Sequence, residues 1–208
     1  MKKILLIGIL GLIITLFTVT ANSQTLYDYD FSTPDGWKFS KNITSGTRNS
    51  KDYDSSIHTT VSFSDGTMKV GGEFFAHKFF PEIYTTGVLE ANFKMKRNGN
   101  FATVAFVSNA RYVTSALYID EAGVVNANHQ YGQANYNGKA LMKLLRREIE
   151  EWHDYTYRVD FDRRVAEVIV DGEKLDEFVF TPYDPDAFKL VFKEAEVKDF
   201  KLSRYYDV

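Results

Sequence analysis

Apolar and polar positions alternate most clearly in the last third of the chain. Between residues 155 and 161, aromatic or aliphatic side chains take every second position, which is the pattern of a half-buried strand. A β-branched run over residues 165–170 ends at Asp171-Gly172, and an Asp-Gly pair supplies the positive φ angles of a tight hairpin turn. A third strand is therefore expected over residues 175–180. Three consecutive antiparallel strands form a meander, which needs a second layer to cover its apolar face.

The same signals recur through the rest of the chain. Asp65-Gly66 and Asn98-Gly99 are further hairpin signals between apolar runs. Residues 140–152 fit either an interrupted strand or a short helix, because their leucines match both periods. The other expected strands cover residues 26–31, 37–39, 59–63, 67–70, 73–80, 87–96, 101–107, 113–119, 124–127, 188–192 and 197–202. Many short strands with frequent turns predict an all-β sandwich of two antiparallel sheets.

The first residues have the pattern of a signal peptide. Two lysines precede an apolar run over residues 4–19, and Ala21-Asn22-Ser23 supplies the small residues of a cleavage site. The alternative is a membrane anchor, because the apolar run is nearly long enough to span a bilayer. We expect a signal peptide over residues 1–23 and a single β-sandwich domain over residues 24–208. The mature protein would then be periplasmic, cell-surface or extracellular, with no membrane span after cleavage.

The composition of the chain excludes several kinds of chemistry and makes nucleic acid an unexpected partner. The chain has no cysteine, which excludes disulfides, thiol catalysis and thiolate metal sites. Export without disulfides favours a bacterial envelope protein. The formal net charge is −3 and no basic stripe occurs, so nucleic acid is not an expected partner. Aromatic residues make up 15% of the chain, which suits the packing of β-sheets.

Several stretches resemble one known superfamily. Residues 85–109 contain a strand of the form Gly-x-x-Glu-Ala-x-x-Lys, and residues 151–159 contain Trp-His followed by an alternating strand. Residues 168–172 read Val-x-Val-Asp-Gly, and residues 198–203 look like a closing strand. These patterns resemble the concanavalin A-like jelly roll. The resemblance implies a two-sheet antiparallel jelly-roll sandwich, in a superfamily of glycan-binding modules, β-glucanases and alginate-lyase-like enzymes.

The chain departs from the catalytic patterns of that superfamily. Its glucanases carry Glu-x-Asp-x-x-Glu on one core strand, which points the carboxylates into one cleft. The corresponding residues 113–121 contain only Asp120 and Glu121, which are adjacent and face opposite sides of a strand. The characteristic strands of the alginate-lyase-like enzymes are also missing. The resemblance therefore favours binding over cleavage.

A polar, tyrosine-containing loop over residues 128–138 is the main candidate site. Amide groups bridge sugar hydroxyls and aromatic rings stack on the apolar face of a pyranose, and this loop supplies both. Glu90 and Lys94 share one face of their strand, and we expect the loop to lie at the rim of a groove on that face. The alternative is a solvated loop rich in turn formers. The predicted ligand-binding residues are Glu90, Lys94, Asn128, His129, Gln130, Tyr131 and Tyr136.

The sequence also contains candidates for lyase chemistry and for a calcium site. A polysaccharide lyase needs a base and a group that neutralises the uronate carboxylate. The candidates are His129, Tyr131 and either Arg146 or Arg147. A structural calcium ion would need several oxygen ligands, for which Asp28, Asp30 and Asp199 are candidates in the first and last strands.

The sequence thus predicts an exported β-sandwich protein that binds an oligo- or polysaccharide, for recognition or utilisation of that polysaccharide. The first alternative is a polysaccharide-cleaving enzyme of the same fold, either a lyase or a glycoside hydrolase. The second is a surface protein that binds another partner and has no glycan role. Both tryptophans, Trp37 and Trp152, are expected to be packed, Trp152 more so, and His153 is expected to face solvent.

Overall fold

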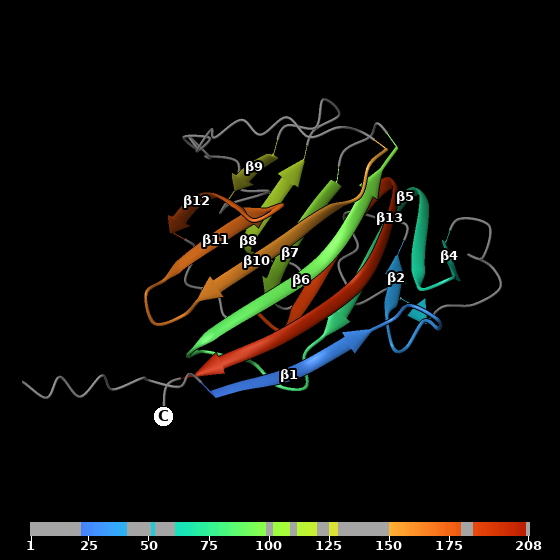
Figure 1. Cartoon of the computed structure of the whole chain (residues 1–208). Helices are drawn as coiled ribbons and strands as arrows, with labels where there is room; N and C mark the ends of the chain where they lie inside the picture. Colours follow the sequence, from blue (N-terminus) through green and yellow to red (C-terminus); the bar gives the residue numbers. More distant parts are fainter. Residues whose placement is uncertain are drawn as a thin grey trace, which may run out of the picture.

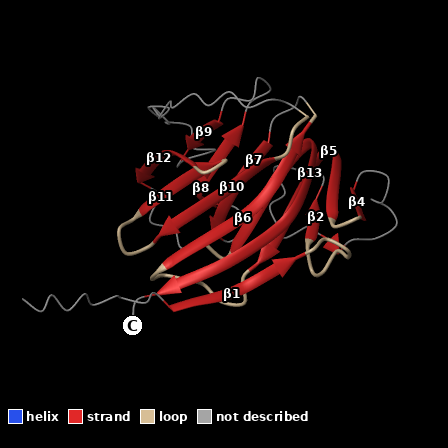
Figure 2. Ribbon diagram, in the orientation of Figure 1, coloured by secondary structure: helices blue, strands red, loops and turns tan. Residues whose placement is uncertain are grey.

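A computed structural model describes residues 22–40, 51–52, 61–98, 102–108, 112–119, 125–128, 150–179 and 185–206. These residues form strands and turns and contain no helix (Figures 1 and 2). Accordingly, this part of the chain holds no helix that could cross a membrane. Residues 1–21 of the predicted signal peptide and residues 140–149 of the ambiguous segment lie outside the described residues, so those two predictions remain predictions. Asn22 and Ser23, the last two residues of the predicted signal peptide, begin the first strand.

Every strand pairs antiparallel with its neighbours. The strands are β1 (Asn22–Tyr29), β2 (Lys38–Ser40), β3 (Lys51–Asp52), β4 (Val61–Ser64), β5 (Thr67–Phe79), β6 (Val88–Arg97), β7 (Ala102–Ser108), β8 (Tyr112–Ile119), β9 (Val125–Asn128), β10 (His153–Asp160), β11 (Val165–Val170), β12 (Glu173–Val179) and β13 (Ala187–Tyr206). The all-β prediction is confirmed.

The long strand β13 joins two layers. Its first residues, 187–192, lie between β5 and β7, while residues 201–205 lie between β6 and β1. We call the layer β12-β11-β10-β6-β13-β1 the front layer, because it faces the viewer in Figure 1. The back layer is β9-β8-β7-β13-β5-β2-β3, and β4 pairs with the start of β5. This is the two-layer antiparallel arrangement expected from the sequence.

One expectation about the last strands is wrong. The sequence predicts two strands, over residues 188–192 and 197–202, but the structure has the single strand β13. The pairing register shifts between Phe192 and Glu194 and again between Lys198 and Lys201, where Asp199 has a φ of 54°. The polar residues that suggest a break are therefore β-bulges, which bend a strand without ending it.

The Asp-Gly turns form as predicted. Asp65 and Gly66 have φ angles of 52° and 69°, and Asp171 and Gly172 have φ angles of 50° and 79°. Two consecutive positive φ angles are what a two-residue hairpin turn matched to the twist of its strands requires. The first turn joins β4 to β5 and the second joins β11 to β12.

The core between the layers is aromatic. Phe188 of β13 lies 5.3 Å from Phe106 of β7 and 6.2 Å from Phe93 of β6, measured between ring centroids. Phe200, further along β13, lies 5.0 Å from Phe188. Full burial of such a side chain contributes roughly 1.5–3 kcal/mol to folding. On β6 the residues that alternate with Phe93 point the other way, onto the outer face of the front layer.

Candidate functional site

A row of charged residues crosses the outer face of the front layer. Glu90 of β6 is paired with Arg158 of β10, which is paired with Glu167 of β11, which is paired with Glu177 of β12. Tyr157, the neighbour of Arg158, is fully buried in the core. Because successive side chains of a strand point to opposite faces, Arg158 points outward.

Arg158 links two carboxylates in this row. Its Nε donates a hydrogen bond of 2.8 Å to Oε2 of Glu90, and its Nη2 donates to the same oxygen. Its Nη1 donates to Oε2 of Glu167 at 3.1 Å. The other oxygen of Glu90 accepts hydrogen bonds from Asn92 Nδ2 at 2.8 Å and from the Tyr205 hydroxyl at 3.2 Å. Glu90 is only 7% exposed, so these contacts satisfy a nearly buried charge.

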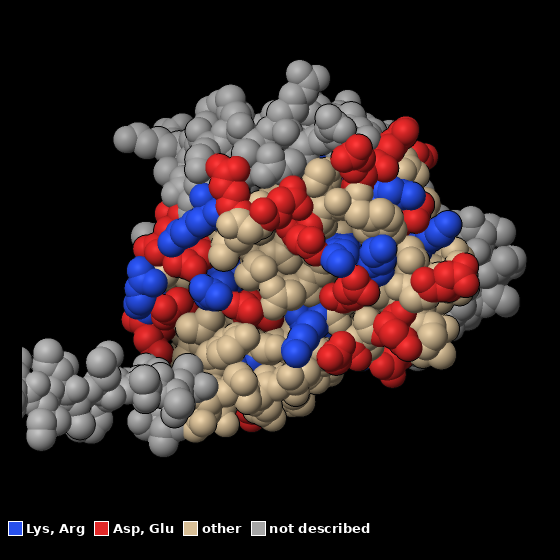
Figure 3. Space-filling model, viewed as in Figure 1, with Lys and Arg blue, Asp and Glu red and all other residues tan. Residues whose placement is uncertain are grey.

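The row continues to the edge strand β12. Lys174 Nζ donates to Glu167 Oε1 at 2.8 Å and to Glu177 Oε2 at 3.3 Å. Arg163 Nη2 donates to Glu177 Oε1 at 2.9 Å. Cations and carboxylates therefore alternate across the sheet, and Figure 3 shows blue and red side chains next to one another on this face.

These contacts set the protonation states of the row. Burial alone would lower the pKa of Arg158, but hydrogen bonds and negative charge from Glu90 and Glu167 outweigh it and raise that pKa. The hydrogen bond from Lys174 is the main cause of the lowered pKa of Glu167, against the opposing effect of burial. Burial and the charge of Glu90 raise the pKa of Tyr205. At neutral pH the row thus holds an arginine cation, a Glu167 anion and a neutral phenol.

A groove opens along this row. Its volume is about 350 Å³, within the range of small-ligand sites. Polar oxygens and guanidinium nitrogens alternate along it, beside the ring of Tyr205. The lining residues are Val88, Glu90, Arg158, Asp160, Arg163, Glu167 and Tyr205.

The structure separates the predicted ligand-binding residues into three groups. Glu90 lines the groove, while Lys94 shares its face but binds Asp199 Oδ2 at 3.4 Å and Asp154 Oδ1 at 3.8 Å. The backbone of Asn128 ends β9, in the back layer. The remaining predicted ligand-binding residues lie outside the described residues, as does the lyase candidate Arg146; they are His129, Gln130, Tyr131 and Tyr136. Whether the loop borders this groove therefore stays a prediction.

The calcium candidates do not form a cluster. Oδ1 of Asp30 accepts a hydrogen bond of 2.9 Å from the backbone nitrogen of Ser32, and Asp199 is paired with Lys94. Asp28 lies on β1 opposite Lys201. In the part of the chain that the structure describes, no three His, Cys, Asp or Glu residues are placed to hold a metal ion. Asp28, Asp30 and Asp199 are all within that part.

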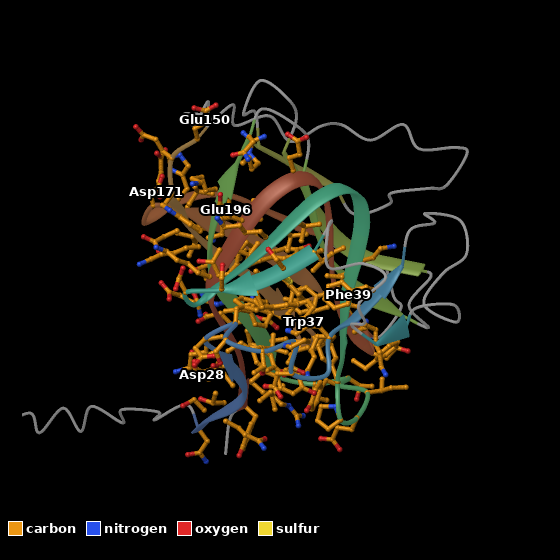
Figure 4. All side chains as sticks on the ribbon, turned by 90° about the vertical axis from the view of Figure 1, so that its right-hand side faces the viewer. Asp28, Trp37, Phe39, Glu150, Asp171 and Glu196 are labelled. Carbon is orange, nitrogen blue, oxygen red and sulfur yellow. The ribbon has the colours of Figure 1, made fainter. Side chains whose placement is uncertain are left out.

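The prediction that Trp152 is more buried than Trp37 is wrong, because the structure shows the reverse. Trp37 is 1% exposed and packs against Phe200 with 5.4 Å between ring centroids, whereas Trp152 is partly exposed. In Figure 4 Trp37 lies in the interior, while Asp171 lies at the edge. Trp152 precedes β10 and has its indole on the outer face, over which two lysines lie. Trp152 has the same parity as Arg158, an outward residue of β10, so it points away from the core.

His153 also differs from the prediction. Its Nδ1 lies 2.9 Å from Oδ2 of Asp171, and its side chain is only 12% exposed. The hairpin turn at Asp171 also accepts a hydrogen bond from the backbone nitrogen of Asp154 at 2.9 Å. The turn therefore covers the start of β10, and His153 does not face open solvent.

The residues that sequence reasoning missed are Arg158, Glu167 and Tyr205. The alternation of residues 155–161 already places Arg158 outward. The four-residue turn before β11 then pairs Arg158 with Glu167. A register count around that turn would have found the pair, whereas Tyr205 comes from a strand with two bulges, where counting fails.

Comparisons with known proteins establish the fold. Neither protein-family models nor curated protein sequences give a match. The structure of SCLam, a non-specific endo-β-1,3(4)-glucanase from family GH16, is similar with a TM-score of 0.61 and 11% identity, over 88% of this chain and 92% of that one. The metal-free carbohydrate recognition domain of Emp46p is similar with a TM-score of 0.55 and 8% identity, over 86% of this chain and 95% of that one.

A third match is a sialidase, with a TM-score of 0.52 and 14% identity over 68% of this chain. The chain spans only 16% of the length of that sialidase. Together with the antiparallel layers, these matches show that the chain has the concanavalin A-like jelly-roll fold, which glycan-binding lectins and glycoside hydrolases share.

Proposed function

We propose that this protein binds glycans through the groove on its front layer. The observation that carries the proposal is the hydrogen-bonded row of Glu90, Arg158 and Glu167 along a groove of about 350 Å³. Sugar hydroxyls both donate and accept hydrogen bonds, so a surface that alternates carboxylates and guanidinium groups suits them. The ring of Tyr205 adds an apolar surface with a polar end. The fold supports the same class, since SCLam is a glucanase and the Emp46p domain recognises carbohydrate.

Binding fits the row better than cleavage. A glycosidase needs one carboxylic acid with a raised pKa to protonate the leaving oxygen. Glu167 has a lowered pKa instead, because Lys174 donates a hydrogen bond to it. Glu90 already accepts hydrogen bonds on both oxygens. Residues 113–121 also lack the spaced carboxylates of the glucanases.

Filling the groove tests the proposal. Val88 lines it, so Val88→Trp should abolish the binding of an oligosaccharide found on a glycan array. Ile169→Trp is the matched control, because Ile169 lies on the outer face of β11 and does not line the groove. Isothermal titration and thermal melting of both variants separate lost binding from lost folding. Equal loss in both variants, or binding unaffected by Val88→Trp, would place the site elsewhere.

Two activity assays accompany the titration. The release of reducing ends detects a hydrolase, and ultraviolet absorbance of unsaturated uronates detects a lyase. We expect neither from the wild-type protein. Turnover would favour a polysaccharide-cleaving enzyme, and the absence of any glycan ligand would favour a surface partner-binding protein.

We also propose that the protein is exported. Support comes from the two lysines, the apolar run over residues 4–19 and the small residues 21–23. Cleavage after Ser23 should leave Gln24 at the N-terminus. Intact-mass analysis of protein from the cell envelope checks this, and a mass that retains residues 1–23 would indicate a membrane anchor.

A further inference from the structure

A second cluster lies on the same outer face, beyond the groove. The indole of Trp152 has Lys198 Nζ at 4.2 Å and Lys96 Nζ at 5.5 Å from its ring centroid. Lys96 and Lys198 come from neighbouring strands, β6 and β13, and Trp152 comes from the start of β10. We call these three residues the Trp152 platform.

The lysines around this platform differ in how their charges are balanced. Lys96 Nζ lies 3.2 Å from Glu196 Oε1, and Lys69 Nζ lies 4.0 Å from Glu196 Oε2. Lys198 has no carboxylate partner among the described residues, and its ammonium group lies over the indole instead. An aromatic ring positions a cation without bringing an opposite net charge, whereas a carboxylate partner brings one. Among the described residues, Lys198 is therefore a positioned cation without a paired carboxylate, beside a partly exposed ring.

The platform and the groove lie along the same strand. Lys198 is paired with Lys94, which follows Glu90 by four residues on β6. At about 3.3 Å per residue, Lys198 lies roughly 13 Å from Glu90 along the strand direction, and Trp152, six residues before Arg158, lies roughly 20 Å from Arg158. A chain of a few sugar units that starts in the groove could therefore extend over the platform without leaving this face. Trp152 is partly exposed and offers such a sugar the part of its indole that the lysines do not cover, and Lys198 offers the sugar's substituent a positive charge.

We propose that the Trp152 platform binds an anionic group, a carboxylate or a sulfate, carried by the glycan that occupies the groove. This inference rests on the proposed function and narrows it to acidic polysaccharides. Glu196 would repel such a group, but Lys96 Nζ lies 3.2 Å from Glu196 Oε1 and compensates its charge. The attraction is electrostatic and partly exposed, so it weakens as salt screens it.

The test measures the binding of three polysaccharides to the full chain. They are polygalacturonate, a sulfated galactan and a neutral β-glucan, each titrated at low and at high salt. Lys198→Gln removes the cation over the indole, and Lys69→Gln is the control that changes the net charge equally but removes a paired lysine. We expect Lys198→Gln to weaken binding of one acidic polysaccharide by about fivefold or more at low salt, as loss of one favourable contact does. Lys69→Gln should change it less than about twofold.

Trp152→Ala should weaken the same binding by about tenfold, and Trp152→Phe, which keeps a ring, should recover part of it. Melting curves show whether either variant is unfolded. Weaker binding of polygalacturonate by the variants would identify the bound group as a carboxylate. Weaker binding of the sulfated galactan would identify it as a sulfate.

Other outcomes separate the two proposals. Preference for the neutral β-glucan would overturn the inference but leave groove binding intact. Equal weakening by Lys198→Gln and Lys69→Gln would show unspecific attraction and also overturn it. If no polysaccharide binds at either salt concentration, the proposed function fails together with the inference.

Discussion

The two faces of β6 carry different kinds of residue: one face is apolar and packed, and the other is charged. Its inward residues, such as Phe93 and Leu89, are at most 2% exposed and pack between the layers. Its outward residues, such as Glu90 and Lys94, hold charges in hydrogen bonds and ion pairs. The period of two thus places the packed core and the groove proposed to bind glycans on opposite sides of one strand. A substitution should therefore affect folding on one side and mainly binding on the other.

Removing a ring from the core should have the largest effect. Phe188 contacts rings from both layers and is fully buried, so Phe188→Ala leaves a cavity where the layers meet. We expect it to lower the free energy of unfolding by roughly 3–5 kcal/mol. Urea denaturation measures this value. A loss below about 1 kcal/mol would show that the layers do not depend on this contact.

Much of the inward face could be predicted from the sequence, and less of the outward one. Alternation alone identifies Phe93 as inward and Glu90 as outward, and the Asp-Gly turns place β11 against β12. The contact between Glu90 and Arg158 is different, since 68 positions separate these residues. Their pairing depends on the register between β6 and β10, which no local pattern sets. The bulges in β13, which bring Tyr205 to Glu90, are equally invisible in an alternation pattern.

A buried histidine, His77, makes the stability of the core depend on pH. His77 is 1% exposed, and burial, together with the charge of Lys189, lowers its pKa to about 3. Between pH 6.5 and about 3 the unfolded chain binds a proton at this residue and the folded chain does not. The neutral histidine therefore stabilises the fold above pH 6.5, and this contribution is lost on acidification.

The lost contribution amounts to up to roughly 4 kcal/mol if the whole shift is realised. Unfolding of wild-type protein and of His77→Phe, measured from pH 7 to pH 3, tests this. We expect the variant to lose less stability than the wild type over this interval. Parallel pH profiles would assign the acid sensitivity to other groups.

Removing a charge from the row on the outer face should lower the free energy of unfolding less than removing a ring from the core. Arg158→Met leaves Glu90 and Glu167 without their shared cation. A fully buried pair would lose about 3–5 kcal/mol. The Arg158 side chain is 37% exposed and solvent screens part of the interaction, so we expect about 1–2 kcal/mol at pH 7.

The same variant should be closer to wild type in acid. The pKa of Glu167 is lowered from its ordinary value of 4.5, so its contribution is present above that value and is lost as the pH falls below it. Once Glu167 is protonated, there is less negative charge for Arg158 to balance. Denaturation at pH 7 and pH 3 checks this, and a gap that widens in acid would contradict the role of the ion pairs.

The smallest effect is expected at Lys94, on the same outward face. Its ammonium group lies 3.4 Å from Asp199 and 3.8 Å from Asp154, but its side chain is 40% exposed. Exposed ion pairs of this kind contribute about 0–1 kcal/mol, so Lys94→Gln should change the free energy of unfolding by less than about 0.5 kcal/mol. Lys94 and Glu90 occupy one face of one strand, yet only Glu90 is nearly buried. Exposure, rather than the face alone, therefore decides how much a charge contributes to stability. A loss above 1 kcal/mol in Lys94→Gln, measured by urea denaturation at two salt concentrations, would overturn that distinction.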